Sequence, residues 1–303
     1  DRIRGGTERA GGFSEALAPL TRGGMKPDQI GPIVLAGIRN ELPYIFTHDD
    51  LRDAFAKNQF IVHYQPQYDT NQNDIIGFEA LVRWEHPVRG RIPPNQFIPV
   101  CEEMGLIDEL GKIVLKTACT DAGGWPDHIG IAVNLSPVQF RSRNLPTLIR
   151  EAVEAAGLSP NRLELEITES VMLEDFTAVL DQLRSIKRLG CQVSLDDFGT
   201  GYSSLSYIRH FPFDRIKIDQ SFVRDLADTS DSLAIIRAVV GLCGSLNIKS
   251  TAEGVETLQQ LEILCREQCD SVQGYLFSEP IPLKQTYELL DIPVRRKGRK
   301  AAA

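Results

Sequence analysis

Residues 194–205 are Ser194-Leu195-Asp196-Asp197-Phe198-Gly199-Thr200-Gly201-Tyr202-Ser203-Ser204-Leu205. Two adjacent carboxylates follow an apolar run that starts at Cys191, and a loop with two glycines comes directly after them. The run predicts a buried strand, and the two glycines predict a loop by which the chain leaves this strand. Because neighbouring residues on a strand point to opposite faces, Asp196 and Asp197 can converge on one centre only if the chain bends there, which Gly199 and Gly201 permit. An isolated pair of this kind is more often a solvated turn with an aspartate N-cap, so its meaning depends on the rest of the chain.

Strands and helices alternate on both sides of this stretch. A short helix at 50–57 precedes two strands, 60–67 and 75–84, whose connection is too short for a crossover helix, so they should pair antiparallel. Further strands are predicted at 129–134, 162–168, 192–196, 215–219, 248–252 and 271–273, and further helices at 106–122, 145–156, 177–189, 232–246 and 258–269. This order predicts an α/β fold, a (β/α)8 TIM-like barrel with one antiparallel strand at its start. A doubly wound open sheet is the alternative.

The two ends of the chain depart from this regular pattern. Residues 1–47 contain six glycines within the first 24 positions and one helical pattern at 28–39, and residues 24–48 resemble the C-terminal tail of short-chain dehydrogenases. We predict an irregular, partly disordered N-terminal appendage at 1–47, a main domain at 48–293, and a disordered basic tail at 294–303.

The composition is typical of a soluble globular protein, with 42% hydrophobic and 24% charged residues among 303. The formal net charge of −8 argues against DNA or RNA as partners, because their backbones require a basic face. Six cysteines without a CxxC pair favour buried reduced thiols and a cytoplasmic location. No apolar run reaches the roughly 18 residues of a membrane span. The sequence begins at Asp1, so an upstream membrane anchor in a longer natural chain stays open.

Polar side chains stand at the C-terminal ends of seven predicted strands: Glu79, Asn134, Glu166, Asp196 with Asp197, Lys217, Glu253 and Gln273. In a barrel these ends gather around one mouth. One lysine cannot neutralise five carboxylates, so the excess negative charge requires a cation. Carboxylate and amide donors favour Mg²⁺ or Mn²⁺ over zinc. Two ions about 4 Å apart would suit attack of water on a phosphodiester, with Lys217 orienting the water and Glu253 accepting its proton.

In this order the motifs resemble those of the EAL-domain phosphodiesterases, which hydrolyse cyclic di-GMP. The signature is Glu79-Ala80-Leu81-Val82-Arg83-Trp84, and the other motifs are Ala132-Val133-Asn134-Leu135-Ser136, Glu164-Leu165-Glu166-Ile167-Thr168-Glu169, Asp196-Asp197-Phe198-Gly199-Thr200-Gly201, Lys217-Ile218-Asp219, Ala252-Glu253-Gly254-Val255-Glu256 and Gln273-Gly274-Tyr275. The resemblance covers about residues 51–290 and makes 48–293 the EAL domain.

The resemblance implies a role for each motif residue. The ligands of a first metal ion would be Glu79, Asn134, Glu166 and Asp196, and Asp197 would join Asp196 at a second. The catalytic residues around the attacking water would be Lys217, Glu253 and Gln273. The substrate contacts would be Gln65, Leu81, Arg83, Tyr275, Glu279 and Pro280. The residues that support the loop after Asp197 would be Glu169, Gly199 and Gly201, and this loop and its neighbouring helix would form a homodimer contact.

The implied activity is hydrolysis of cyclic di-GMP to linear pGpG with two Mg²⁺ or Mn²⁺ ions. The series of acids keeps the pattern of the active members. Many relatives have the fold without these acids and act only as receptors, so a non-catalytic cyclic di-GMP receptor or signalling scaffold is the alternative.

Overall fold

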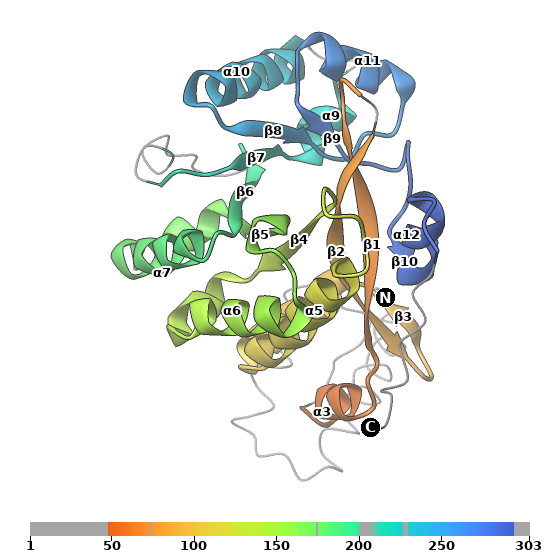
Figure 1. Ribbon diagram of the computed structural model, residues 1–303, viewed down its shortest axis with the longest axis vertical. Coiled ribbons are helices and arrows are strands. Elements are labelled where there is room, and N and C mark those ends of the chain that lie inside the picture. Colours follow the sequence, from red (N-terminus) through yellow and green to blue (C-terminus); the bar gives the residue numbers. More distant parts are fainter. Residues whose placement is uncertain are drawn as a thin grey trace, which may run out of the picture. The chain divides into compact units, whose positions relative to one another are not determined.

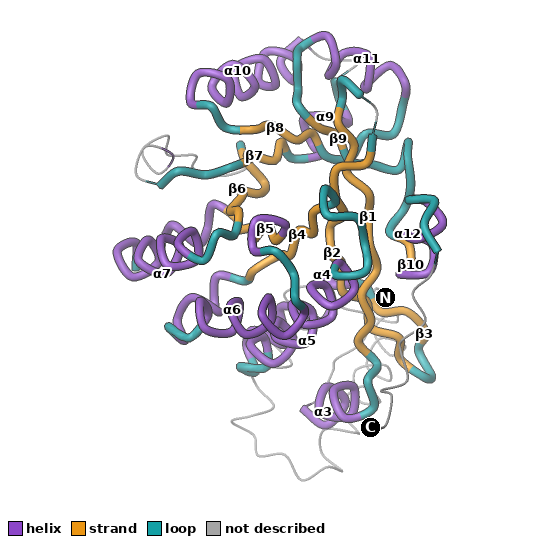
Figure 2. The backbone as a smooth tube through the Cα atoms, viewed as in Figure 1, coloured by secondary structure: helices purple, strands orange, loops and turns teal. Residues whose placement is uncertain are grey.

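The computed structural model describes residues 48–72, 74–173, 175–199, 208, 211–226 and 230–293. The strands are β1 Phe60–Asp69, β2 Ile75–His86, β3 Gly90–Ile92, β4 Gly130–Leu135, β5 Leu163–Thr168, β6 Gln192–Phe198, β7 Arg215–Ile218, β8 Lys249–Ala252, β9 Ser271–Val272 and β10 Ile281–Pro282. The α-helices are α3 His48–Ala56, α4 Pro94–Glu103, α5 Ile107–Ala122, α6 Leu145–Ala156, α7 Phe176–Arg188, α9 Gln220–Arg224, α10 Ser230–Leu246, α11 Leu258–Arg266 and α12 Leu283–Leu289, and η1 Pro137–Ser142, η2 Pro160–Arg162 and η3 Glu169–Leu173 are 3₁₀-helices (Figures 1 and 2).

Eight of these strands close into a barrel. Parallel pairing runs from β2 through β4, β5, β6, β7 and β8 to β9. The ring closes through β1, which pairs antiparallel with β9 and also pairs with β2. β3 extends the sheet beside β2, and β10 extends it beside β1. The predicted TIM-like barrel with one reversed strand is confirmed, and the open doubly wound sheet is excluded.

The barrel is apolar outside and polar inside, and β5 shows how its sequence produces this. Leu163, Leu165 and Ile167 are fully buried, whereas the alternate residues Glu164 and Glu166 reach other side chains inside the ring. This alternation follows from the period of two in a strand. Charged groups at such depth are tolerated only when they are paired, and both of these are.

Two layers of side chains fill the interior. The base layer, at the N-terminal ends of the parallel strands, consists of Glu164, Arg215, Thr251 and Ser271. Arg215 Nε contacts both carboxylate oxygens of Glu164 at 3.1 Å, and its Nη1 donates to Thr251 Oγ1 and Ser271 Oγ at 2.9 and 2.8 Å. The mouth layer, two residues further along the strands, consists of Glu79, Glu166, Asp196, Lys217 and Gln273.

The chain divides into two compact units. The described part of the smaller one, residues 48–61 and 83–110, has an aromatic cluster in which the Phe60 ring lies 4.9 Å from Phe55, 5.6 Å from Trp84 and 5.5 Å from Phe97. The larger one comprises the described residues of 62–82 and 111–293 and contains both layers of the barrel.

The short helix at 50–57 and the five longer helices that the sequence predicts are present, with ends that differ by up to three residues. The elements β3, β10, α4, α9 and α12 were not predicted from the sequence. The helical pattern at 28–39, the appendage at 1–47 and the tail at 294–303 lie outside the described residues.

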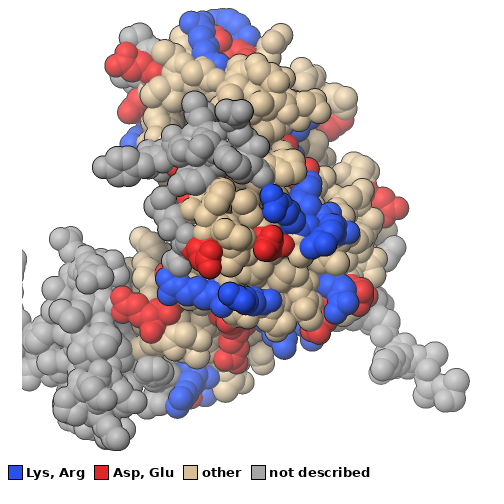
Figure 3. Space-filling model, turned by 90° about the vertical axis from the view of Figure 1, so that its left-hand side faces the viewer, with Lys and Arg blue, Asp and Glu red and all other residues tan. Residues whose placement is uncertain are grey.

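Two surface properties bear on possible partners. On the face shown in Figure 3, Lys and Arg side chains are interspersed with Asp and Glu and form no single basic surface among the described residues. Within the part of the chain that the structure describes, no helix has both the length and the apolar character that a membrane crossing requires.

Candidate active site

One lysine stands among four carboxylates at the mouth of the barrel. β7 carries Lys217, whose side chain is 1% exposed. Its Nζ lies 2.7 Å from Glu166 Oε2, 2.7 Å from Glu253 Oε1, 3.3 Å from Asp196 Oδ1 and 3.7 Å from Glu79 Oε2. These carboxylates come from or directly follow four different strands, so only the closed barrel brings them together. The predicted convergence of strand ends therefore produces a compact acidic cluster with one cation.

Amide side chains hold Glu79 in place. Asn134 Nδ2 donates to Glu79 Oε1 at 2.6 Å, and Gln273 Nε2 donates to Glu79 Oε2 at 2.6 Å. Gln273 Nε2 also donates to Gln65 Oε1 at 3.0 Å. A carboxylate that accepts from two amides and faces an ammonium group is fixed in orientation before any ligand arrives.

The chain bends at Asp197 itself. Asp197 has a φ of 54°, in the left-handed region, and the pairing of β6 with β7 shifts register between Leu195 and Phe198. Such a bulge turns the next side chain toward the same side as its neighbour. As a result the carboxylates of Asp196, Asp197 and Glu253 have oxygens within 4.8 Å of one another. The convergence predicted for the Asp-Asp pair is present, and the aspartate provides the bend before Gly199 is reached.

The loop after this bend is tied to β5. Glu169, the residue after β5, accepts a hydrogen bond from the Gly199 backbone N at 3.0 Å. Gly199 has a φ of 98°, and a Cβ there would lie 2.9 Å from Phe222 Cε2, so only glycine fits without displacement. Gly201 lies outside the described residues.

Burial and neighbouring charges shift the pKa values of the acids in the cluster in different directions. Burial alone would raise the pKa of Glu79, but Lys217 and the donor Gln273 lower it below its ordinary value. Burial and the neighbouring Glu79 raise the pKa of Glu166 well above its usual range, and burial raises that of Glu253 to about 8. Burial alone would lower the pKa of Lys217, but the surrounding carboxylates raise it well above normal. These shifts favour the charged forms of Glu79 and Lys217 and oppose ionisation of Glu166 and Glu253, which a bound cation would favour.

The donor set fits a hard divalent cation. Glu166 Oε1 is a buried oxygen that accepts no hydrogen bond, although Oε2 of the same carboxylate contacts Lys217. An orphaned carboxylate oxygen at this depth is costly unless a cation or a proton satisfies it. Asp196, Asp197 and Glu253 add further oxygen donors, without histidine or cysteine, which is the set that Mg²⁺ and Mn²⁺ prefer.

A pocket opens above this cluster. Its lining includes the predicted substrate contacts Gln65, Leu81 and Tyr275, and the side chain of Tyr275 is largely exposed beside it. Glu279 and Pro280 are not among the lining residues, but the segment is tied to β1, because Gln65 Nε2 donates to the Ser278 carbonyl at 3.2 Å. Arg83 belongs to the smaller unit.

Among the polar side chains that line the pocket, Gln220 and Glu256 were not predicted as site residues. Each stands three residues after a functional candidate, Lys217 and Glu253 respectively, so each lies on the segment that leaves a strand end. That position was the available signal, since residues directly after barrel strands form the walls of the mouth.

Comparisons with known proteins agree with this geometry. The family model of the EAL domain matches residues 48–280. An "Uncharacterized signaling protein" of Caulobacter vibrioides is 53% identical over 234 residues, which are 77% of this chain and 29% of that protein. The "Bifunctional diguanylate cyclase/cyclic di-GMP phosphodiesterase MucR" of Pseudomonas aeruginosa is 45% identical over 240 residues, which are 78% of this chain and 35% of that protein. The chain thus spans about a third of the length of these relatives.

Among solved structures, "PaMucR Phosphodiesterase, c-di-GMP complex" is similar with a TM-score of 0.76 and 44% identity, covering 78% of this chain and 98% of that one. "Structure of EAL Enzyme Bd1971 - cAMP and cyclic-di-GMP bound form" has a TM-score of 0.78 and 28% identity, covering 90% and 72%. With the family match over most of the chain, the closed barrel and the acid cluster at its mouth, this chain belongs to the EAL domain family.

Proposed function

We propose that this domain hydrolyses cyclic di-GMP to linear pGpG. The observation that carries the proposal is Lys217 held by Glu79, Glu166, Asp196 and Glu253 at the barrel mouth. Family membership supports the substrate, because relatives at 38–45% identity have names that include cyclic di-GMP phosphodiesterase, and a similar structure is a complex with c-di-GMP.

The cofactors in this proposal are two Mg²⁺ or Mn²⁺ ions. The residues that would hold them are Glu79, Asn134, Glu166, Asp196 and Asp197. Bound there, such ions would supply charge neutralisation for the phosphodiester and lower the pKa of a water molecule.

The chain's own residues would handle the proton and the substrate. Glu253 has a pKa raised to about 8, so its ionised form would be a stronger base toward the attacking water than an ordinary carboxylate, and the ionised fraction would grow as pH rises through that value. Lys217 would orient that water and counter the charge that develops on phosphate, and Gln273 would keep Glu79 in position. Arg83 has the planar guanidinium that suits a phosphate contact. Gln65, Leu81, Tyr275, Glu279 and Pro280 complete the proposed substrate contacts.

Assembly and location also belong to the proposal. We expect a homodimer through the loop after Asp197 and its neighbouring helix, with Glu169, Gly199 and Gly201 supporting the loop. The tie from Gly199 N to Glu169 Oε1 supports a coupling between this loop and the strand ends. All six cysteines are free, and five are buried, which suits a reducing cytoplasm.

The test is nucleotide chromatography after incubation of cyclic di-GMP with the protein and Mn²⁺. We expect conversion to pGpG, and we expect Glu79→Ala to abolish it by removing a metal ligand. Glu262→Ala, which removes an exposed acid from α11, is the matched control and should leave the rate unchanged. Binding of cyclic di-GMP without any linear product would refute hydrolysis and leave a receptor.

A further inference from the structure

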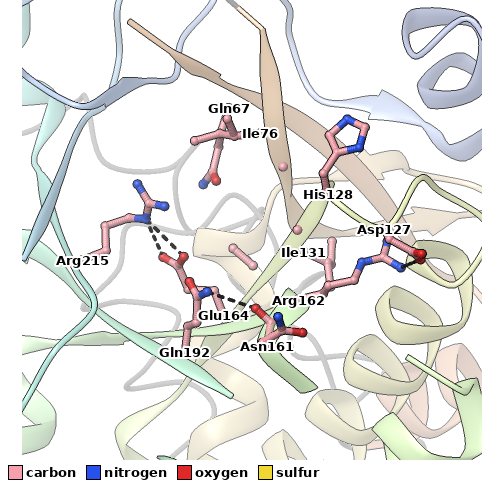
Figure 4. Close-up of a pocket in the computed structure, with 13 residues that line it drawn as sticks. Gln67, Ile76, Asp127, His128, Ile131, Asn161, Arg162, Glu164, Gln192 and Arg215 are labelled. Atoms are coloured by element: carbon pink, nitrogen blue, oxygen red, sulfur yellow. Dashed lines mark hydrogen bonds and ion pairs between the residues drawn. The ribbon is translucent and has the colours of Figure 1, made fainter. Parts of the chain in front are cut away.

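A second pocket lies at the opposite end of the barrel from the proposed site. It is lined by residues near the N-terminal ends of the parallel strands, among them Gly77, Gly130, Glu164 and Arg215 (Figure 4). Gln67 also lines it. This residue stands near the C-terminal end of β1, and it reaches the base because β1 is the reversed strand.

Gln67 is linked to the proposed catalytic cluster by buried amides. Its Nε2 donates to Gln273 Oε1 at 3.1 Å. Gln273 Nε2 in turn donates to Glu79 Oε2 at 2.6 Å and to Gln65 Oε1 at 3.0 Å. All four side chains are at most 8% exposed. The register explains the contact, because Tyr68 pairs with Val272, and the next pair along these antiparallel strands is Gln67 with Gln273.

The direction of the Gln273 amide matters for Glu79. An ionised carboxylate only accepts hydrogen bonds, so Gln273 must present its NH₂ group, not its carbonyl, to Glu79. Donation from Gln67 holds the carbonyl of Gln273 on the opposite side. Without that donor, the buried carbonyl of Gln273 loses its partner, and only the bonds from its NH₂ group to Glu79 and Gln65 still oppose a 180° turn that would set the carbonyl against the carboxylate.

We infer that Gln67 is a positioning residue that fixes the Gln273 amide and, through it, the Glu79 carboxylate. The consequence of this positioning for catalysis rests on the proposed function, whereas the effect of Gln67 on the Gln273 amide does not. Residues that orient a metal ligand through a hydrogen bond commonly change metal affinity when they are removed. Gln67 acts one hydrogen bond further out, so we expect a smaller effect.

The test compares Gln67→Met, Gln273→Met and the double variant. Met preserves the length of the side chain and removes the amide. We expect Gln67→Met to shift the Gln273 side-chain amide resonances in ¹H–¹⁵N spectra and to weaken Mn²⁺ binding, measured by calorimetry, roughly three- to tenfold. In the Gln273→Met background the same substitution should cause no further loss of affinity, because the group through which Gln67 acts is absent.

Two further variants make the result specific. Gln192→Met is the matched control, since Gln192 also lines the base pocket but donates to the Asn161 carbonyl at 3.0 Å, and it should leave Mn²⁺ affinity unchanged. Gln67→Glu preserves the size but offers only acceptors, so it should turn the Gln273 amide and weaken binding more than Met does. It also serves if the Met variant does not fold.

Unshifted Gln273 amide signals in both Gln67 variants would overturn the inference. So would an equal loss of Mn²⁺ affinity with and without Gln273, which would mean that Gln67 acts by another route. Failure of the proposed function has a different signature. In that case the wild-type protein forms no pGpG, while the substitutions at Gln67 still move the Gln273 amide resonances.

Discussion

Lys217 is the residue on which the electrostatics of the site depend. A lysine with 1% exposure loses nearly all of its hydration, yet its pKa is raised because four carboxylates face it. The same lysine lowers the pKa of Glu79 and opposes the rise at Glu253. Removing it would leave buried acids that are neutralised only by protons or by a metal ion.

We therefore predict that Lys217→Met lowers kcat by at least about 100-fold, the scale on which a positioned proton-transfer group contributes. Binding of uncleaved cyclic di-GMP in Ca²⁺ should change much less, because the proposed substrate contacts Gln65, Leu81 and Tyr275 line the pocket and Lys217 does not. Comparing kcat with the dissociation constant separates the two. Equal losses in both quantities would assign Lys217 to binding instead of chemistry.

At the scale of elements, β6 is the strand whose irregularity matters. Its regular part pairs with β5 up to Asp196, and its register with β7 then shifts. Asp197, at a φ of 54°, uses a conformation that aspartate and asparagine adopt more readily than other residues that carry a Cβ. The bulge therefore places two consecutive carboxylates on one side of the sheet, which a regular strand cannot do.

Two substitutions at Asp197 test this bulge. Asp197→Asn keeps the tolerance for a left-handed conformation and loses the carboxylate, so activity should fall with little change in the free energy of unfolding. Asp197→Val loses both, and its β-branched side chain should lower the free energy of unfolding by a further 1–2 kcal/mol or so. Urea denaturation measures the difference. If the two variants unfold at the same urea concentration, the left-handed conformation is not needed for stability.

For the larger unit as a whole, ion pairs inside and around the barrel join strands that are distant in the sequence. Arg215 and Glu164 link β7 to β5 in the base layer. Outside that layer, Asp270, which directly precedes β9, accepts hydrogen bonds from Ser250 N and Oγ, both at 2.9 Å, and from Lys249 Nζ at 2.6 Å. The stability of the barrel should therefore depend on the ionisation of Asp270.

The direction in which stability changes with pH follows from the pKa of Asp270. Burial raises it, but the bonds from Lys249 and Ser250 lower it below the ordinary 3.8. Because the folded pKa is the lower one, the contribution to stability is complete above the unfolded pKa and is lost as pH falls through the folded value.

Asp270→Asn should thus lower the free energy of unfolding by about 1 kcal/mol at neutral pH. The difference from the wild type should shrink as the pH falls below about 4. Denaturation at a series of pH values measures it, with Asp74→Asn, at an exposed position, as control. A difference that stays constant down to pH 2 would refute the role of ionisation.

The barrel, its reversed strand and the acids at its mouth could all be predicted from the sequence. These follow from local properties: the period of apolar residues marks the elements, a short turn sets the antiparallel start, and parallel strands must bring their ends to one mouth. The order of the motifs around Glu79, Asp196 and Lys217 was sufficient to identify the family.

The contacts between these groups depend on the three-dimensional fold and could not be predicted. Lys217 contacts acids that are up to 138 positions away, and Gln67 meets Gln273 across 206 positions, because closing the ring pairs the first strand with the last. The left-handed turn at Asp197 depends on a register shift against β7. Local sequence patterns do not specify these individual contacts, because the segment around one residue does not indicate which distant residue it will meet. Packing in three dimensions selects one direction for each side chain from the several that are possible.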